Sequence, residues 1–163
     1  MFKKFIATMV LSLAVSASTI AAEIPVDAKL DYNQGIDFYK LGMYERAIES
    51  FRSAIRAYPD YIDAYYNLGT VLEYLRNYSE ATVIFKQIYV RNPHDYEVIY
   101  KLANLSAKTE DYTKANEYLS LIPSTSEYYK RAQELAESIK VDITKPVQVQ
   151  NTPSKIATQT GVY

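Results

Sequence analysis

The 163-residue sequence predicts an all-α fold of the solenoid class, in which similar helix pairs stack one after another. A period of 34 residues carries this prediction, because the same residue type returns at Tyr32, Tyr66 and Tyr100. The same step relates four more sets: Tyr44, Tyr78 and Tyr112; Ala47, Ala81 and Ala115; Gly35, Gly69 and Ala103; Phe51, Phe85 and Leu119. Within one period, apolar residues recur at three and four positions, as on one face of an α-helix. A fixed period of this length is typical of an array built from one supersecondary unit.

Residues 1–22 precede the predicted domain and have the layout of a secretory signal peptide. Lys3 and Lys4 form a basic start, residues 5–15 are apolar, and small residues lead to Ala22, where we expect cleavage. The uncharged stretch 5–22 is close to the lower length limit for a membrane span, so retention as an anchor is the alternative. We expect an exported protein, periplasmic or secreted, and the short basic start favours a bacterial precursor.

Residues 61–75 show the helical pattern most clearly, with one apolar face formed by Ile62, Tyr65, Leu68, Leu72 and Leu75. Gly69 lies on this face, and its small size lets a second helix approach closely. Asn77, with Glu80 three residues later, predicts the N-cap of that second helix. Pro93, like Pro59 one unit earlier, predicts a helix end, because proline cannot donate a hydrogen bond to the preceding turn.

Asp60 and Asp95 follow these prolines, and we expect each of them to cap the next helix. Pro123 interrupts the last unit, so we expect its second helix to stop about one turn early. A further helix is predicted at 125–140 with Ser126 as its cap. Its apolar face carries Tyr128, Ala132, Leu135, Ala136 and Ile139, whereas Lys130, Arg131, Glu134 and Glu137 lie away from it.

The repeated residues resemble those of the tetratricopeptide repeat (TPR) family. The second unit matches best, with Tyr66-Asn67-Leu68-Gly69, Leu72, Tyr78, Ala81, Phe85 and Pro93. The first carries Gly35, Leu41-Gly42, Tyr44, Ala47, Phe51, Ala54 and Pro59, and the weaker third carries Leu102-Ala103, Tyr112, Ala115, Leu119 and Ile122. The resemblance implies repeats at about 28–61, 62–95 and 96–124, each a helix–turn–helix pair, within a domain at 23–140. Residues 125–140 would then cover the last repeat, and 141–163 are predicted to be a disordered tail.

Composition argues against several classes of function. The chain has no cysteine, so thiolate chemistry and cysteine-bound zinc are excluded, and its formal net charge is only −1. No basic run indicates nucleic-acid binding, and no phosphate loop, nucleophile elbow or zinc motif is present. His94, the single histidine, is interpreted as a solvated turn residue. We therefore expect no catalytic residue, metal, cofactor, small-molecule substrate or nucleic-acid partner.

The resemblance implies a concave groove on the first helix of each pair. Its lining positions correspond here to Tyr32, Ile36, Tyr39, Lys40, Tyr66, Thr70, Glu73, Tyr74, Tyr100, Asn104, Ala107 and Lys108. Tyrosine offers a large contact area and a hydroxyl, which suits the binding of an extended peptide. For any one tyrosine, packing on a neighbouring repeat is an equally weighted alternative.

Some family members hold a C-terminal carboxylate with two Lys, two Asn and one Arg or Lys. The matching positions here are Tyr32, Ile36, Asn67, Glu97 and Lys101, of which only Asn67 and Lys101 fit. These two residues join the predicted groove, but Glu97 would repel a carboxylate, so that function is not expected.

The sequence therefore predicts a non-catalytic, exported protein-binding module or scaffold, in an envelope or secretion assembly, that binds a peptide or partner segment in a Tyr-rich groove. One alternative is a self-associating structural protein. The other is a membrane-anchored adaptor that keeps its N-terminal helix, the one case in which we expect membrane contact.

Overall fold

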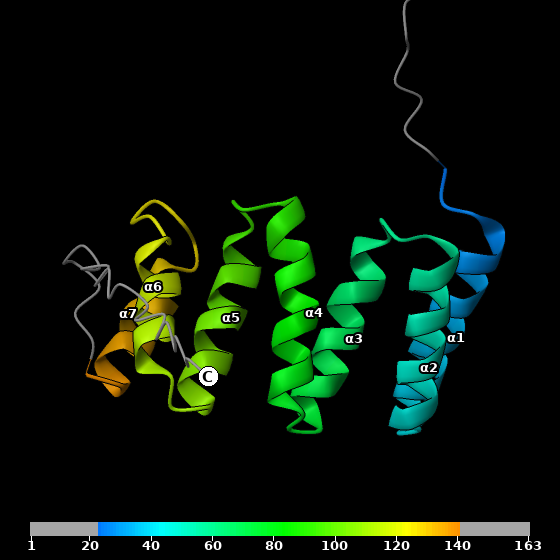
Figure 1. Ribbon diagram of the computed structural model, residues 1–163, viewed down its shortest axis with the longest axis horizontal. Coiled ribbons are helices and arrows are strands. Elements are labelled where there is room, and N and C mark those ends of the chain that lie inside the picture. Colours follow the sequence, from blue (N-terminus) through cyan, green and yellow to red (C-terminus); the bar gives the residue numbers. More distant parts are fainter. Residues whose placement is uncertain (1–22, 141–163) are drawn as a thin grey trace, which may run out of the picture.

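The computed structural model describes residues 23–140, which form seven helices and no strand (Figure 1). The predicted all-α fold is confirmed. The helices are α1 (Val26–Lys40), α2 (Tyr44–Ala57), α3 (Ile62–Tyr74), α4 (Tyr78–Arg91), α5 (Tyr96–Lys108), α6 (Tyr112–Ser120) and α7 (Tyr129–Ser138). The signal-peptide or anchor prediction for 1–22 and the tail prediction for 141–163 lie outside the described residues. Within residues 23–140, no helix is long and apolar enough to cross a membrane.

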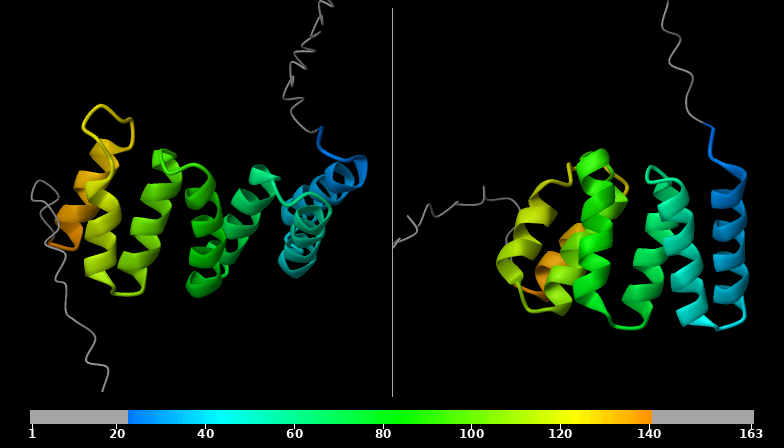
Figure 2. Two further views of the ribbon diagram at one scale, coloured as in Figure 1. Left: turned by 45° about the horizontal axis from the view of Figure 1, so that its top comes forward. Right: turned by 45° about the vertical axis from the view of Figure 1, so that its right-hand side comes forward.

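The helices are antiparallel neighbours that follow chain order along the long axis (Figures 1 and 2). The tightest associations are within the pairs α1–α2, α3–α4 and α5–α6, and each pair then packs on the next through α2–α3 and α4–α5. Turns within the pairs lie along one edge of the array, and connections between pairs lie along the opposite edge (Figure 1). This arrangement is a solenoid of helix hairpins, with α7 packed against α6 at its end.

Small residues allow the paired helices to approach. A Cβ placed on Gly35 would lie 2.6 Å from the ring of Phe51, and a Cβ on Gly69 would lie 2.9 Å from the ring of Phe85. Both rings are almost completely buried. The two glycines and the two rings are each one period apart, so the same close contact recurs in successive repeats.

The core is one continuous apolar cluster that runs from Ala47 in α2 to Ala136 in α7. Leu68, Leu72 and Phe85 fill its middle and are at most 2% exposed. Burial of this kind is the main favourable term in folding, because apolar surface leaves water. A smaller cluster of Ala28, Ala54, Tyr61 and Ala64 closes the N-terminal end.

The turn within each pair places one residue in the left-handed region of backbone space. These residues are Gly42 (φ 72°), Arg76 (φ 62°) and Glu110 (φ 61°), and they are again one period apart. Glycine adopts this conformation without strain, whereas a residue with a Cβ does so at a cost. Only the first repeat has the unstrained residue at this position.

Side-chain caps follow the sequence in part. The Asn77 side chain accepts a hydrogen bond from the Glu80 N–H, and the Asp95 side chain accepts one from the Val98 N–H, as predicted. Asp111 caps α6 in the same way and was not predicted. The prediction for Asp60 is wrong, because α3 has Tyr61 at its N-cap position and no side-chain cap.

The C-terminal end differs from the prediction in one respect. The nine-residue α6 ends before Pro123, in agreement with the expected early stop, since α2 and α4 each have 14 residues. The helix predicted from residue 125 begins only at Tyr129. Ser126 does not cap it, because its hydroxyl accepts the Tyr128 N–H at 3.2 Å within the preceding turn.

Candidate functional site

The face formed by α1, α3 and α5 carries three adjoining hollows, which together we call the groove. The α1–α3 hollow, of about 60 Å³, is lined by Ile36, Tyr39, Phe51, Asn67, Thr70 and Val71. The α3–α5 hollow, of about 370 Å³, is lined by Tyr39, Thr70, Glu73, Tyr74, Arg76, Tyr78, Lys101 and Lys108. The α5–α7 hollow, of about 310 Å³, is lined by Tyr66, Glu97, Tyr100, Lys101, Asn104, Tyr128 and Arg131. Because neighbouring hollows share lining residues, they form one continuous surface feature.

Most of the predicted groove residues line a hollow, but Tyr32, Lys40 and Ala107 do not. The Tyr32 ring packs against Phe51 and Tyr61, with ring centroids 5.8 and 4.8 Å apart. Its hydroxyl accepts a hydrogen bond from Asn67 Nδ2 at 2.8 Å. Tyr32 therefore ties α1 to α3, which is the packing role that the sequence left open for each tyrosine.

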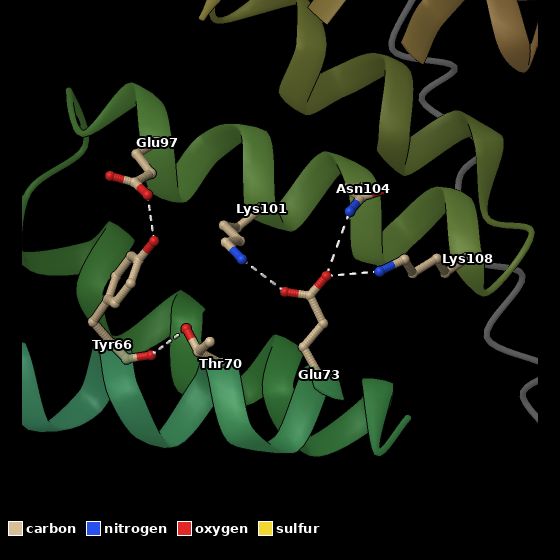
Figure 3. Close-up of polar contacts among 7 residues, drawn as sticks. All are labelled: Tyr66, Thr70, Glu73, Glu97, Lys101, Asn104 and Lys108. Atoms are coloured by element: carbon tan, nitrogen blue, oxygen red, sulfur yellow. Dashed lines mark hydrogen bonds and ion pairs between the residues drawn. The ribbon is translucent and has the colours of Figure 1, made fainter. Parts of the chain in front are cut away.

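Glu73 is the centre of a polar network between α3 and α5 (Figure 3). Its carboxylate accepts hydrogen bonds from Lys101 at 3.0 Å, Lys108 at 2.7 Å and Asn104 at 3.4 Å. The Glu73 side chain is only 12% exposed. Burial alone would raise the pKa of Glu73, but the hydrogen bonds from Lys108 and Lys101 outweigh it and lower the pKa below its usual value. The carboxylate is therefore ionised at neutral pH and holds both lysines in place.

A second contact joins the same two helices. The Tyr66 hydroxyl donates a hydrogen bond to Glu97 (Figure 3). The Tyr66 ring packs edge-on against Phe85, with ring centroids 5.8 Å apart. Burial, and then the hydrogen bond to Glu97, raise the pKa of Tyr66 well above its usual value. The Thr70 hydroxyl donates to the Tyr66 carbonyl at 2.9 Å, within α3. These polar groups are bonded to one another, so they hold the groove wall in place and are not free to bind a ligand.

In the first two repeats, the tyrosine that begins the second helix supports a groove residue of the next repeat. Tyr44 packs against Tyr74 with ring centroids 4.9 Å apart. One period later, the Lys108 ammonium lies 5.4 Å from the centre of the Tyr78 ring, a cation–π contact. Tyr74 is 61% exposed, so one side of its ring is available to a partner.

Sequence reasoning missed the contribution of the C-terminal helix. The Arg131 guanidinium lies over the rings of Tyr100 and Tyr128, at 5.6 and 5.9 Å from their centres. The sequence predicts that α7 covers the last repeat and that Arg131 lies away from its apolar face. The three-residue spacing of Tyr128 and Arg131 is the available signal, but the position of α7 against α5 depends on the tertiary fold.

The groove offers aromatic surface, hydroxyls and charged groups, which can bind a chain segment. Among residues 23–140, no group of three or more histidine, cysteine or carboxylate side chains could hold a metal ion. His94 is exposed in the turn before α5 and lines a further hollow with Asp95 and Glu127, which adjoins the α5–α7 hollow through Glu97 and Tyr128.

The fold and the groove define a solenoid protein built from helix hairpins, with adjoining hollows on one face. Two family models match parts of the chain. Residues 35–74 match a model described as TPR repeat, and residues 62–95 match a model described as tetratricopeptide repeat. Residues 35–95 thus match models of the tetratricopeptide repeat, and the stacked helix hairpins have the fold of that repeat.

Solved structures of three other proteins share the fold. The TPR2B domain of yeast Sti1 in its pHsp70 complex is 15% identical over 71% of this chain and 98% of that one, with a TM-score of 0.62. Yersinia enterocolitica SycD, in complex with a peptide of the translocator YopD, is 20% identical over 73% and 97%, with a TM-score of 0.62. MamA from Desulfovibrio magneticus RS-1 is 24% identical over 70% and 67%, with a TM-score of 0.59. At these identities the likeness is one of fold alone.

Proposed function

We propose that this protein is a non-catalytic protein-binding module that holds an extended peptide or partner segment in the groove. The observation that carries the proposal is the continuity of three hollows across α1, α3, α5 and α7. An extended segment can cross several repeats and contact exposed aromatic rings such as Tyr74 and Tyr39 along the way. Large aromatic side chains with few rotatable bonds are common energetic anchors at protein interfaces.

Proteins of the same fold support this proposal. The Sti1 domain was solved in a pHsp70 complex and SycD with a peptide of YopD, so the shared fold is compatible with peptide binding. The polar network of Glu73 supports it in another way. Because this network fixes α3 against α5 before a partner arrives, little ordering of the groove is required on binding, which favours affinity.

We also propose that the protein is exported and acts in an envelope or secretion assembly. Support comes from residues 1–22, whose basic start, apolar stretch and small residues before Glu23 are typical of a secretory signal.

Site-specific photo-crosslinking in the native cells tests the proposal. A photoreactive residue at Tyr74, inside the groove, should capture a protein partner. The matched control is Val90, which belongs to α4, lies outside the groove and is 78% exposed. A partner captured at Val90 and not at Tyr74 would place the binding surface elsewhere and contradict the proposal.

One observation favours self-association as a second candidate function. Val26 and Leu30 lie at the N-terminal end of the array and are 73% and 64% exposed. No earlier repeat covers them within the described residues, so a second copy could pack there. Sedimentation of the purified protein over a dilution series tests this, and a mass that stays at one chain at every concentration would exclude it.

A further inference from the structure

Arg131 occupies an unusual position in the groove. Its guanidinium is held over two tyrosine rings on the wall of the α5–α7 hollow. It forms no ion pair with any carboxylate in residues 23–140. The Tyr100 hydroxyl on the same wall is likewise without a hydrogen bond to the described part of the chain. This hollow therefore offers a positioned cation and a hydroxyl that the domain itself does not use.

The other charges near this hollow are already engaged. Lys101 is bound by Glu73 at 3.0 Å, and Glu97 accepts a hydrogen bond from the Tyr66 hydroxyl. Glu97 keeps its negative charge and would repel an incoming carboxylate, so the carboxylate is expected at the guanidinium of Arg131, which forms no ion pair with Glu97. An incoming anion would meet the Arg131 guanidinium as the cation of this hollow that has no carboxylate partner.

Charge balance points in the same direction. The α3–α5 and α5–α7 hollows are lined by four cations, Arg76, Lys101, Lys108 and Arg131, against the two carboxylates of Glu73 and Glu97. Residues 23–140 as a whole carry a net negative charge, because 18 of the 19 acidic side chains and 14 of the 18 basic side chains lie there. The groove is therefore locally positive on a negative domain as far as the adjoining acidic hollow of Asp95 and Glu127, and it would attract an acidic segment.

We propose that the α5–α7 hollow is a specificity pocket for an Asp or Glu side chain of the segment bound in the groove. Guanidinium and carboxylate match in a two-point geometry, and the cation–π contacts with Tyr100 and Tyr128 hold the guanidinium at the wall of the hollow. The inference rests on the proposed function. The pocket differs from the site with which some family members hold a C-terminal carboxylate, because its cation comes from α7 and not from the repeats.

Peptide selection tests the pocket. Phage-displayed random 12-residue peptides are selected on the purified protein in its natural processed form. We expect the selected peptides to share an Asp or Glu at one position beside aromatic or apolar residues. Changing that acid to its amide should weaken binding about tenfold, the range for a charged hydrogen bond. Raising the salt concentration should weaken binding of the acidic peptide and leave binding of its amide form nearly unchanged.

Two variants isolate the role of Arg131. On Arg131→Gln, the acidic peptide and its amide form should bind equally, and on Arg131→Glu selection should favour Lys or Arg at that position. Lys130→Gln is the matched control, because Lys130 is an exposed α7 neighbour paired only with Glu134 at 4.0 Å. Thermal melting checks that each variant folds. A folded Arg131→Gln protein that still prefers the acidic peptide would overturn the inference.

The failures of the two proposals can be told apart. Peptides that need Tyr74 and Tyr100 but show no acidic preference would reject the acidic pocket and leave the proposed groove function standing. Peptides that bind equally well without these tyrosines, or a failure to select any peptide, would reject both.

Discussion

The ring of Phe85 lies 2.9 Å from the point where a Cβ on Gly69 would stand, and this contact closes the α3–α4 pair. The same relation holds between Phe51 and Gly35 at 2.6 Å. In the third pair both partners change together, to Leu119 and Ala103, and both are fully buried. A smaller second-helix residue thus accompanies a larger first-helix residue.

This relation predicts the effect of Gly69→Ala. The added methyl group would clash with a buried ring, and overpacking of this kind costs about 1–3 kcal/mol, offset by roughly 1 kcal/mol of better helix propensity. We expect a net loss of unfolding free energy in urea denaturation. In a Phe85→Leu background the same change should be neutral or stabilising, as in the third repeat. An equal loss in both backgrounds would contradict this account.

The strained turns predict a stabilising change. Glu110 adopts φ 61° at the position where the first repeat has Gly42. Glu110→Gly should raise the unfolding free energy by about 0.5–1 kcal/mol, because glycine adopts the left-handed conformation without steric cost. Thr109→Gly, one residue earlier at φ −99°, is the control and should destabilise. Chemical denaturation measures both changes.

Glu73 predicts a loss of stability in acid. Its folded pKa lies below the unfolded value, so its contribution is present above that value and is lost as the pH falls through the folded pKa. Wild type should therefore lose more stability than Glu73→Gln as the pH falls from 5 toward 3. At pH 7 the variant should be less stable by about 1 kcal/mol, since its exposure is low but its lysine partners are partly solvated.

Glu49→Gln is the matched control for this measurement. Glu49 pairs with Arg56 at 2.9 Å, but both side chains are more than 60% exposed. An exposed ion pair contributes little to the free energy of unfolding, so this variant should keep the wild-type dependence of stability on pH. Equal behaviour of the two variants would mean that the Glu73 network is no stronger than a surface ion pair.

Tyr74→Ala should weaken binding of the partner crosslinked in the groove by about 1–2 kcal/mol, the range for an aromatic anchor, as measured by titration calorimetry. Because Tyr74 is 61% exposed, the melting temperature should change little. Val90→Ala, outside the groove, should have no effect on binding. If Tyr74 is dispensable while deletion of 141–163 abolishes binding, the C-terminal segment and not the groove is the recognition element.

Processing can be measured directly. Mass spectrometry of the exported protein should show a chain that starts at or near Glu23, because the residues before it form a signal-like cleavage region. An intact N-terminus in a washed membrane fraction would support the anchored alternative.

The sequence predicted those features that depend on local pattern and on the period. Gly69 and Asn77 were assigned correctly, because close helix packing and N-capping need particular residue types at short spacing. Asp60 was assigned wrongly, since its side chain faces Arg91 at 3.4 Å, an interaction between residues far apart in sequence. Arg131 was missed for the same kind of reason. Its place in the groove depends on how α7 docks against α5, which no local pattern encodes.

The paired contacts of Tyr44 with Tyr74 and of Tyr78 with Lys108 have an evolutionary consequence. In both repeats a tyrosine at the start of the second helix supports the groove residue of the next repeat, once through a ring and once through an ammonium group. The supporting residue stays the same while the supported one changes its chemistry. A lineage can therefore exchange an aromatic contact for a charged one in a single substitution, and acquire a different ligand preference, without rebuilding the scaffold beneath it.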